Sequence, residues 1–108
     1  MTIISDKNVI MMELTRPTAQ AIIKQLASTS ERVKYSDHVR ARMRERRITT
    51  RQVMSCLKSG CISEEPIRSI KGNWVLSVRA IAAGDPLTVV IALDHDRDGN
   101  YALIITAF

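Results

Sequence analysis

The spacing of the apolar residues changes at Gly60, and this change restricts the folds that the chain can adopt. Before Gly60, apolar side chains recur three and four residues apart, which is typical of amphipathic helices. After Gly60 they alternate with polar ones, which is typical of strands with one buried face. Because the helices come before the strands instead of alternating with them, the pattern predicts an α+β fold.

Three helices are predicted before Gly60, over about residues 17–28, 37–47 and 49–59. Each begins at or after a hydroxyl side chain that can accept a hydrogen bond from the first helical turn: Thr15, Ser36 and Thr49. Thr49 and Gln52 also have the spacing of a capping box. Gly60 suits a left-handed stop after the third helix. The segment "STSERVK" between the first two helices is expected to be a polar connector.

Four strands are predicted after Gly60, over residues 62–70, 74–82, 87–93 and 101–107. The turns between them contain "GN", "AGDP" and "HDRDGN". Pro66 cannot donate a backbone hydrogen bond, so the first strand is expected at a sheet edge. The complete expectation is a four-stranded antiparallel β-meander with the N-terminal helices packed on one face.

Positive charge is concentrated in one segment. Residues 32–51 carry eight basic side chains against two acidic ones, a net of +6, whereas the whole chain carries +5. Most are arginines, whose planar guanidinium group suits phosphate. The asymmetry favours a polyanionic partner such as RNA, bound through the exposed helix face of Arg40, Arg44 and Arg47 and through Arg51. The alternative is a solvated helix face that only keeps the protein soluble.

Membrane and metal functions have less support. The sequence has no run of about 18 apolar residues and no apparent secretory signal, so we expect a cytoplasmic protein with reduced thiols at Cys56 and Cys61. Zinc would need more ligands, and only His38 and His95 remain. "DHDRDGN" has the spacing of an EF-hand start, but Ile105 stands where glutamate is required, so a hairpin loop is expected. We therefore expect no metal and no other cofactor.

Candidate site residues lie on the second helix and on a strand. His38 and Arg42 are four residues apart on one helix face, and Arg46 follows one turn later. A histidine here can transfer a proton near neutral pH, or it can serve only in capping or packing. Arg79 stands in the apolar run "WVLSVRAIAA" and faces either a functional site or solvent.

The segment "HVRARMRERRITTRQV" resembles an uncharacterised bacterial domain family that opens with His-x-x-x-Arg-Met-x-x-Arg-x-Ile. A glycine after the next helix and a last strand ending in "ITAF" belong to the same resemblance, which covers residues 35–108. That family is similar to the RelE and BrnT toxins. More widely, it is similar to the barnase–EndoU–colicin–RelE fold of small ribonucleases.

The resemblance implies metal-independent RNA cleavage, by attack of a 2′-hydroxyl on the adjacent phosphate, in a toxin that an antitoxin protein neutralises. His38 would transfer a proton, Thr106 would bind a phosphate oxygen, and three arginines would stabilise the phosphate: Arg42, Arg46 and Arg79. The alternative is a non-catalytic module that binds nucleic acid or protein with the same basic helix. If these side chains converge on one concave site, the ribonuclease interpretation is favoured; if they do not, the binding module is.

Residues 1–34 lie outside the resemblance, and we expect them to form a docking element rather than part of the domain. Residues 1–14 suit a short strand or an arm that docks on a partner. The apolar helix face of Ile22, Ile23 and Leu26 has to be covered. Its cover is either the domain's own sheet or a second copy of the chain, in which case the protein is a homo-oligomer.

Overall fold

The computed structural model describes residues 13–82 and 84–108. Residues 1–12, which include most of the expected N-terminal arm, lie outside the described residues. Within the described ranges, three helices and a six-stranded mixed sheet form an α+β fold, which is the predicted class. None of these helices is both long and apolar enough to cross a membrane.

The helices are α1 (Arg16–Ala27), α2 (Asp37–Arg46) and α3 (Thr50–Ser59). All three begin after the predicted capping residues, because the side chains of Thr15, Ser36 and Thr49 each accept a hydrogen bond from the first turn. Thr49 and Gln52 form the complete capping box. The local capping chemistry therefore locates the start of every described helix.

The strands are β1 (Val33–Tyr35), β2 (Cys61–Ile62), β3 (Ile67–Arg68), β4 (Trp74–Ala82), β5 (Asp85–Asp96) and β6 (Gly99–Ala107). Their order in the sheet is β1-β6-β5-β4-β2, and β3 also pairs with β4. β4, β5 and β6 form an antiparallel meander, as predicted. The expectation of four antiparallel strands was nevertheless incomplete, because β1 pairs with β6 in parallel.

Two local features explain the difference. The predicted strand over residues 62–70 is divided into β2 and β3 on either side of Pro66, and both pieces pair with β4. β1 lies in the segment that was predicted to be a polar connector, and its Val33 pairs with Ala102 of β6. A strand of three residues with one buried side chain is too short to show alternation, and its hydrogen bonds come from a distant part of the sequence.

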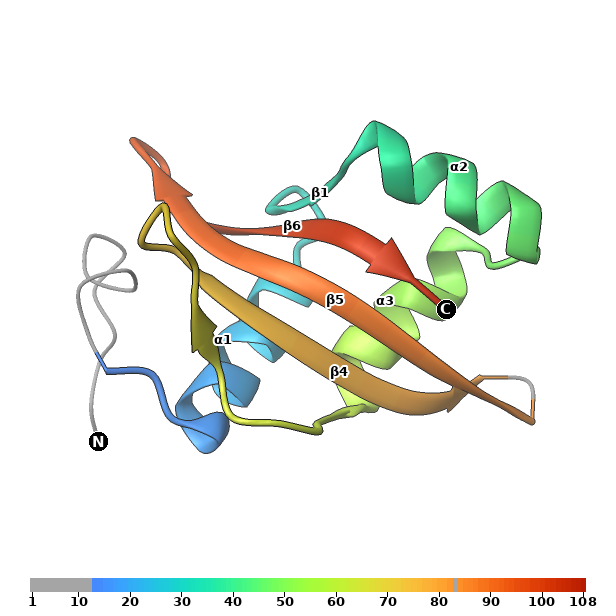
Figure 1. The fold of residues 1–108 in the computed structure, drawn as a ribbon, viewed down its shortest axis with the longest axis horizontal. Helices are drawn as coiled ribbons and strands as arrows, with labels where there is room; N and C mark the ends of the chain where they lie inside the picture. The colour runs from blue at the N-terminus through green and yellow to red at the C-terminus, as the bar shows by residue number, and fades with distance from the viewer. Residues whose placement is uncertain (1–12, 83) are drawn as a thin grey trace.

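The helices cover one face of the sheet and leave the other open. Figure 1 shows α1 and α3 behind the sheet, with α2 beyond it on the side of β6. The apolar face of α1, with Ile22, Ile23 and Leu26, is buried in the same core as the side chains of α3 and the long strands. The apolar face of α1 is therefore covered by the domain's own core, which was one of the two expected alternatives; the other was a second copy of the chain.

Two helix ends differ from the prediction. Gly60 has an extended backbone with φ of −76°, so it is not a left-handed stop. A β-carbon at Gly60 would lie 2.5 Å from the carbonyl oxygen of Cys56 and 2.7 Å from that of Arg79, so glycine is required for space. The left-handed residue is instead Arg47, with φ of 57°, and α2 therefore ends one residue earlier than predicted.

Candidate functional site

The first turn of α2 is attached to the middle of β6 by Ser36. The backbone N–H of Ser36 donates to the carbonyl oxygen of Ile104 at 3.2 Å. Its hydroxyl donates to the carbonyl oxygen of Ile105 at 3.4 Å and accepts from the N–H of Val39 at 3.1 Å. One side chain thus caps the helix and positions it against the strand, two residues before His38.

A β-bulge at this attachment point turns Thr106 toward the open face of the sheet. Ile91 pairs with Ile104, but the next residue back on β5, Val90, pairs with Thr106, so Ile105 is the extra residue. Ile91, Ile104 and Ala107 are fully buried against the helices. Without the bulge, strict alternation from Ile104 would have placed Thr106 on the buried face.

Arg79 lies on the same open face, two strands away. It pairs with Thr88 of β5, whereas Val90 pairs with Ser77 and Thr106. Strand spacing and the two-residue offset place the Cα atoms of Arg79 and Thr106 about 12 Å apart. A long guanidinium side chain reaches across much of that separation, so both residues border one region of the face.

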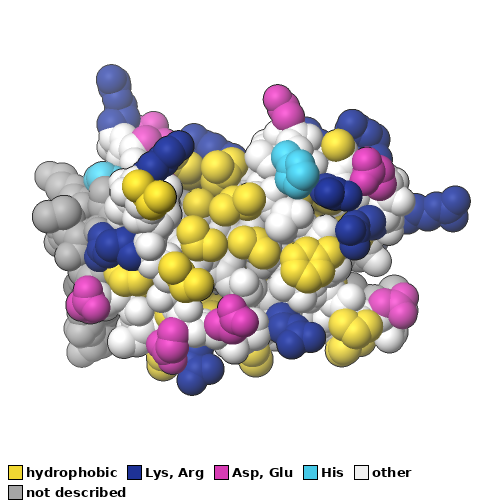
Figure 2. Space-filling model, in the orientation of Figure 1, with side chains coloured by type: hydrophobic (Ala, Val, Ile, Leu, Met, Phe, Trp, Pro, Cys, Tyr) yellow, Lys and Arg dark blue, Asp and Glu magenta, His cyan; other side chains and the backbone are white. Residues whose placement is uncertain are grey.

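The rest of the open face is apolar with a basic border. Its alternating positions carry mainly aliphatic side chains: Val75, Val90, Ala92 and Leu103. Figure 2 shows this face, with hydrophobic side chains across the sheet and Lys and Arg side chains gathered over the α2 region. Negative charge that approaches this face therefore meets its strongest attraction along α2.

The α2 residues of the predicted site are spread along the helix. His38 is exposed, and Arg42 is partly buried, with one guanidinium nitrogen 3.3 Å from a carboxylate oxygen of Glu45. At 1.5 Å per residue, Arg42 lies about 6 Å and Arg46 about 12 Å from His38 along the helix axis. His38 and Arg42 are therefore close enough along the helix to reach one small group, whereas Arg46 lies too far from His38 to share it.

Arg46 instead lines a surface pocket together with Arg47. The pocket has a volume of about 240 Å³ and lies between the end of α2, the first turn of α3 and the start of β5. Its wall includes Gln52, Asp85 and Phe108. Sequence reasoning did not connect these three residues, because they come from separate elements and no local pattern links them.

Arg47 is separated from the other arginines that were expected to share its face. Arg40 and Arg44 line a second pocket, of about 220 Å³, with Tyr35. The guanidinium carbon of Arg40 lies 5.5 Å from the centroid of the Tyr35 ring. Burial raises the pKa of the Tyr35 hydroxyl, and the nearby Arg40 opposes that shift. The left-handed backbone at Arg47 ends the helix, and Arg47 lines the first pocket while Arg40 and Arg44 line the second.

Arg51, the remaining predicted nucleic-acid contact, lies in the first turn of α3 and is exposed. Its guanidinium group is exposed to solvent and has no hydrogen-bond or ion-pair partner within residues 13–82 and 84–108. It extends the basic surface beyond α2.

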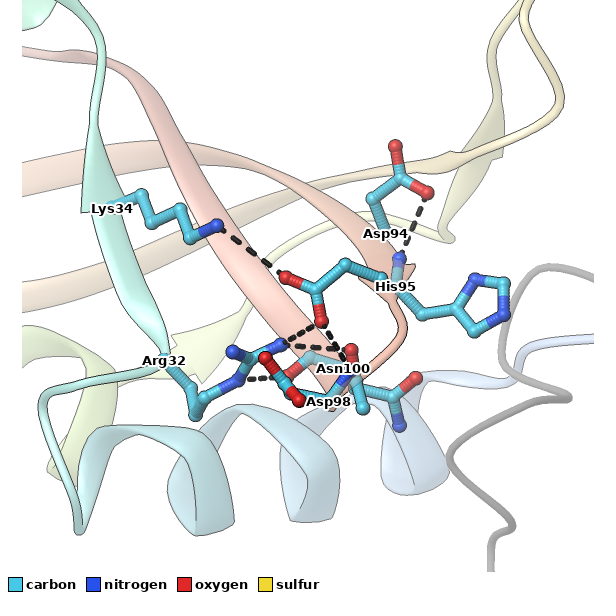
Figure 3. A network of polar contacts seen from close by, with 8 residues as sticks. Arg32, Lys34, Asp94, His95, Asp98 and Asn100 are labelled. Atoms are coloured by element: carbon cyan, nitrogen blue, oxygen red, sulfur yellow. Dashed lines mark hydrogen bonds and ion pairs between the residues drawn. The ribbon is translucent and has the colours of Figure 1, made fainter.

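The carboxylates of the β5–β6 hairpin form a structural network. Arg32 donates to Asp96 at 2.7 Å and to the carbonyl oxygens of Gly99 and Asn100, and Lys34 lies 3.5 Å from the second Asp96 oxygen (Figure 3). The hydrogen bond from Arg32 lowers the pKa of the Asp96 carboxyl to about 2. The segment is a hairpin turn, as predicted, with Gly99 at φ of 123°.

The thiols are also distinct. Cys56 is buried, its Sγ lies 3.6 Å from the carbonyl oxygen of Val78, and burial raises its pKa to about 11. Cys61 is exposed. Across the described ranges, no three His, Cys, Asp or Glu side chains are grouped closely enough to hold a metal ion.

Residues 35–108 match a family described as a domain of unknown function (DUF4258). No curated protein and no solved structure has a significant match to the chain. The matched segment starts at Tyr35, immediately before the Ser36 attachment, and contains every residue of the candidate site described above.

Proposed function

The chain belongs to the DUF4258 family, a domain of unknown function, and from that premise we propose that it is a small ribonuclease that cleaves RNA without a metal ion. The observation that carries the proposal is the attachment of α2 to the bulge of β6. Ser36, two residues before His38, is held at the part of β6 where Thr106 faces outward, and this supports a role for His38 as the proton-transfer group beside Thr106. The resemblance to RelE and BrnT toxins supports the same activity.

The proposed reaction is an internal transfer at phosphorus. The 2′-oxygen attacks the adjacent phosphorus, and the bond from phosphorus to the 5′-oxygen breaks. The products are a 2′,3′-cyclic phosphate and a free 5′-hydroxyl. His38 accepts the proton of the 2′-hydroxyl, and the leaving 5′-oxygen takes a proton from the imidazolium or from water. Arg42 stabilises the added negative charge, and Thr106 donates a hydrogen bond to a phosphate oxygen.

The remaining predicted residues have supporting roles in this proposal. Arg46 is about 12 Å from His38, so we assign it to a neighbouring phosphate rather than to the reacting one. The spacing of about 6 Å between Arg42 and Arg46 is comparable with the distance between successive phosphates of an RNA strand. Arg79 contacts the strand from the β4 side, and Arg40, Arg44, Arg47 and Arg51 attract it through charge.

A non-catalytic binding module is the second candidate, and one observation favours it. The other histidine, His95, lies five residues from Val90 on β5, which is about 17 Å from the row that contains Thr106. It cannot supply the second proton-transfer group of a two-residue mechanism. In either case the resemblance to toxins leads us to propose an antitoxin protein as a partner.

The test is single-turnover cleavage of labelled RNA in the presence of a chelator, measured together with equilibrium binding. We expect His38→Ala to lower the cleavage rate by at least about 100-fold, because a positioned general base contributes that much, while RNA affinity changes by no more than a few-fold. Arg46→Ala should lower affinity. His95→Gln is the matched control and should cut at the wild-type rate.

Two results contradict the ribonuclease proposal. One is cleavage by His38→Ala at the wild-type rate. The other is wild-type protein that binds RNA but leaves it intact over many binding lifetimes, which would support the binding module instead.

A further inference from the structure

The pocket at the end of α2 has the chemical groups of a nucleotide site. Arg46 and Arg47 supply two positive charges, Asp85 one negative charge, and Phe108 an aromatic ring that is 54% exposed. Within residues 13–82 and 84–108, none of these three charged side chains takes part in an ion pair. The pocket therefore offers unpaired groups of both signs beside an aromatic surface.

Phe108 connects this pocket to the open face of the sheet. Its backbone exchanges two hydrogen bonds with Thr88, at 2.7 and 2.9 Å, so the two residues are directly opposite each other and their side chains share a face. Thr88 in turn pairs with Arg79. Phe108, Thr88 and Arg79 thus form one row across three adjacent chain segments, which joins the pocket to the Arg79 side of the open face.

Gln52 and Asp85 present complementary hydrogen-bonding groups to a ligand. The side-chain oxygen of Gln52 accepts from the backbone N–H of Thr49 at 2.8 Å, so its amide NH₂ remains as a donor. The Asp85 carboxylate can only accept hydrogen bonds when ionised. A fixed donor and a carboxylate acceptor together can distinguish one base from another through the hydrogen-bonding groups on its edge.

From this combination we propose that the pocket binds one nucleotide of the RNA, with a preference for guanosine; the inference rests on the proposed RNA substrate. The base stacks on Phe108, and its phosphate contacts Arg46 and Arg47. The two adjacent N–H groups of the guanine edge donate to Asp85, and the guanine O6 accepts from Gln52. Adenine presents an amino donor where guanine has O6, and uracil presents one N–H between two carbonyl oxygens, so neither matches both groups.

The position along α2 fits a nucleotide that neighbours the cleavage site. Arg46 is one helical turn beyond Arg42 and about 12 Å from His38. An RNA strand that runs along α2 with its reacting phosphate at His38 and Arg42 therefore brings the next nucleotide to the pocket. Recognition of a base at this point would direct cleavage to one side of guanosine.

The test uses fluorescent RNA pentamers with 2′-O-methyl groups, which cannot be cleaved because the attacking hydroxyl is blocked. Three pentamers carry G, A or U at the centre of an otherwise all-U strand, and their affinities are measured by anisotropy. We expect the wild type to bind the G pentamer about tenfold more tightly than the other two. Asp85→Asn should bring this ratio close to one, whereas Asp98→Asn, the same charge change on the β5–β6 turn, should leave it unaltered.

Phe108 is tested separately, through affinity rather than preference. Phe108→Leu keeps an apolar side chain but removes the stacking surface, and it should weaken binding of the G pentamer about tenfold or more, as should Phe108→Ala. Phe108→Tyr keeps an aromatic ring and should bind the G pentamer with wild-type affinity. Thermal unfolding of each variant establishes that it is folded, which is expected because the side chain is largely exposed.

The outcomes separate the pocket from the general proposal. RNA that binds tightly with no preference for G, or with no effect of Phe108→Leu, overturns the pocket and leaves the ribonuclease proposal standing. Guanosine preference that depends on Asp85 supports the pocket even if His38→Ala shows that the protein does not cut. If the wild-type protein binds neither the pentamers nor a longer RNA, both proposals are overturned.

Discussion

At the scale of single residues, Asp96 shows how one charged side chain stabilises the fold. Its carboxylate is held by Arg32 and Lys34, and its pKa is lowered to about 2. A lowered carboxyl pKa adds stability that is fully present above the unfolded-state pKa of about 3.9 and is lost as the pH falls through about 2. The network joins β1 to the β5–β6 hairpin, so this stability belongs to the edge of the sheet.

We therefore predict that Asp96→Asn lowers the free energy of unfolding by a constant amount between about pH 5 and pH 8. The difference from the wild type should shrink between about pH 4 and pH 2, because the wild-type carboxylate becomes protonated there. Urea unfolding across this range measures it, with Asp98→Asn as the control. If the difference in unfolding free energy stays constant down to about pH 2, the ionised form of Asp96 does not stabilise the fold.

The sequence allowed part of the geometry of the candidate site to be predicted and not the rest. His38 and Arg42 share a face because helical spacing is local, and the spacing could be read directly. The outward direction of Thr106 depends on a bulge, which arises from pairing with β5 and has no local signal. Gln52, Asp85 and Phe108 come together only when α3, β5 and the segment after β6 are in place.

At the scale of the elements, α2 depends on its attachment to β6. Ser36 and Thr49 are both helix N-caps, but only the Ser36 hydroxyl also donates to a strand, at Ile105. We predict that Ser36→Ala and Thr49→Ala each lower the free energy of unfolding by about 1 kcal/mol. Ser36→Ala should also lower the rate of RNA cleavage, or RNA affinity if the protein does not cut, because α2 loses a hydrogen bond that holds it to β6.

Chemical denaturation and the cleavage assay, carried out on both variants, measure these effects. Thr49→Ala is the matched control for the loss of a cap alone. If the two variants lose function equally, the effect is general destabilisation, and the Ser36 attachment has no specific part in the site.

The elements that could be predicted are those with strong local signals. Three caps located the helices, and alternation located β4, β5 and β6. β1 was missed because its pairing partner, β6, is distant in sequence and only Val33 of its side chains is buried. An interruption at Pro66 in an edge strand was predicted. The two separate strands were not, because β2 and β3 have two residues each, which is too few to show a strand pattern.

At the scale of the whole molecule, α1 is part of the core. Ile23 is 2% exposed in the cluster that also contains the central strands. We predict that Ile23→Ala lowers the free energy of unfolding by about 2–5 kcal/mol, through lost burial and the cavity that remains. Ile70→Ala, the matched control at a fully exposed isoleucine, should change it by less than about 0.5 kcal/mol.

This prediction opposes the expectation that residues 1–34 form a docking element rather than part of the domain. Urea unfolding of the two variants decides between the expectations. Equal stability of Ile23→Ala and the wild type would mean that α1 is only a loosely attached docking element. The boundary at residue 35 would then mark the limit of the folding unit as well as the limit of the family match.

The position of β6 in the sheet has a consequence for synthesis on the ribosome. β6 leaves the ribosome after the other five described strands, yet it lies between β1 and β5 and provides the carbonyl oxygens that hold Ser36. A nascent chain that has not yet exposed β6 contains His38 and the basic residues but lacks the β6 carbonyl oxygens that hold the start of α2. The surface proposed to act on RNA is therefore complete only after β6 has left the ribosome, so we expect a partly made chain to lack the proposed activity.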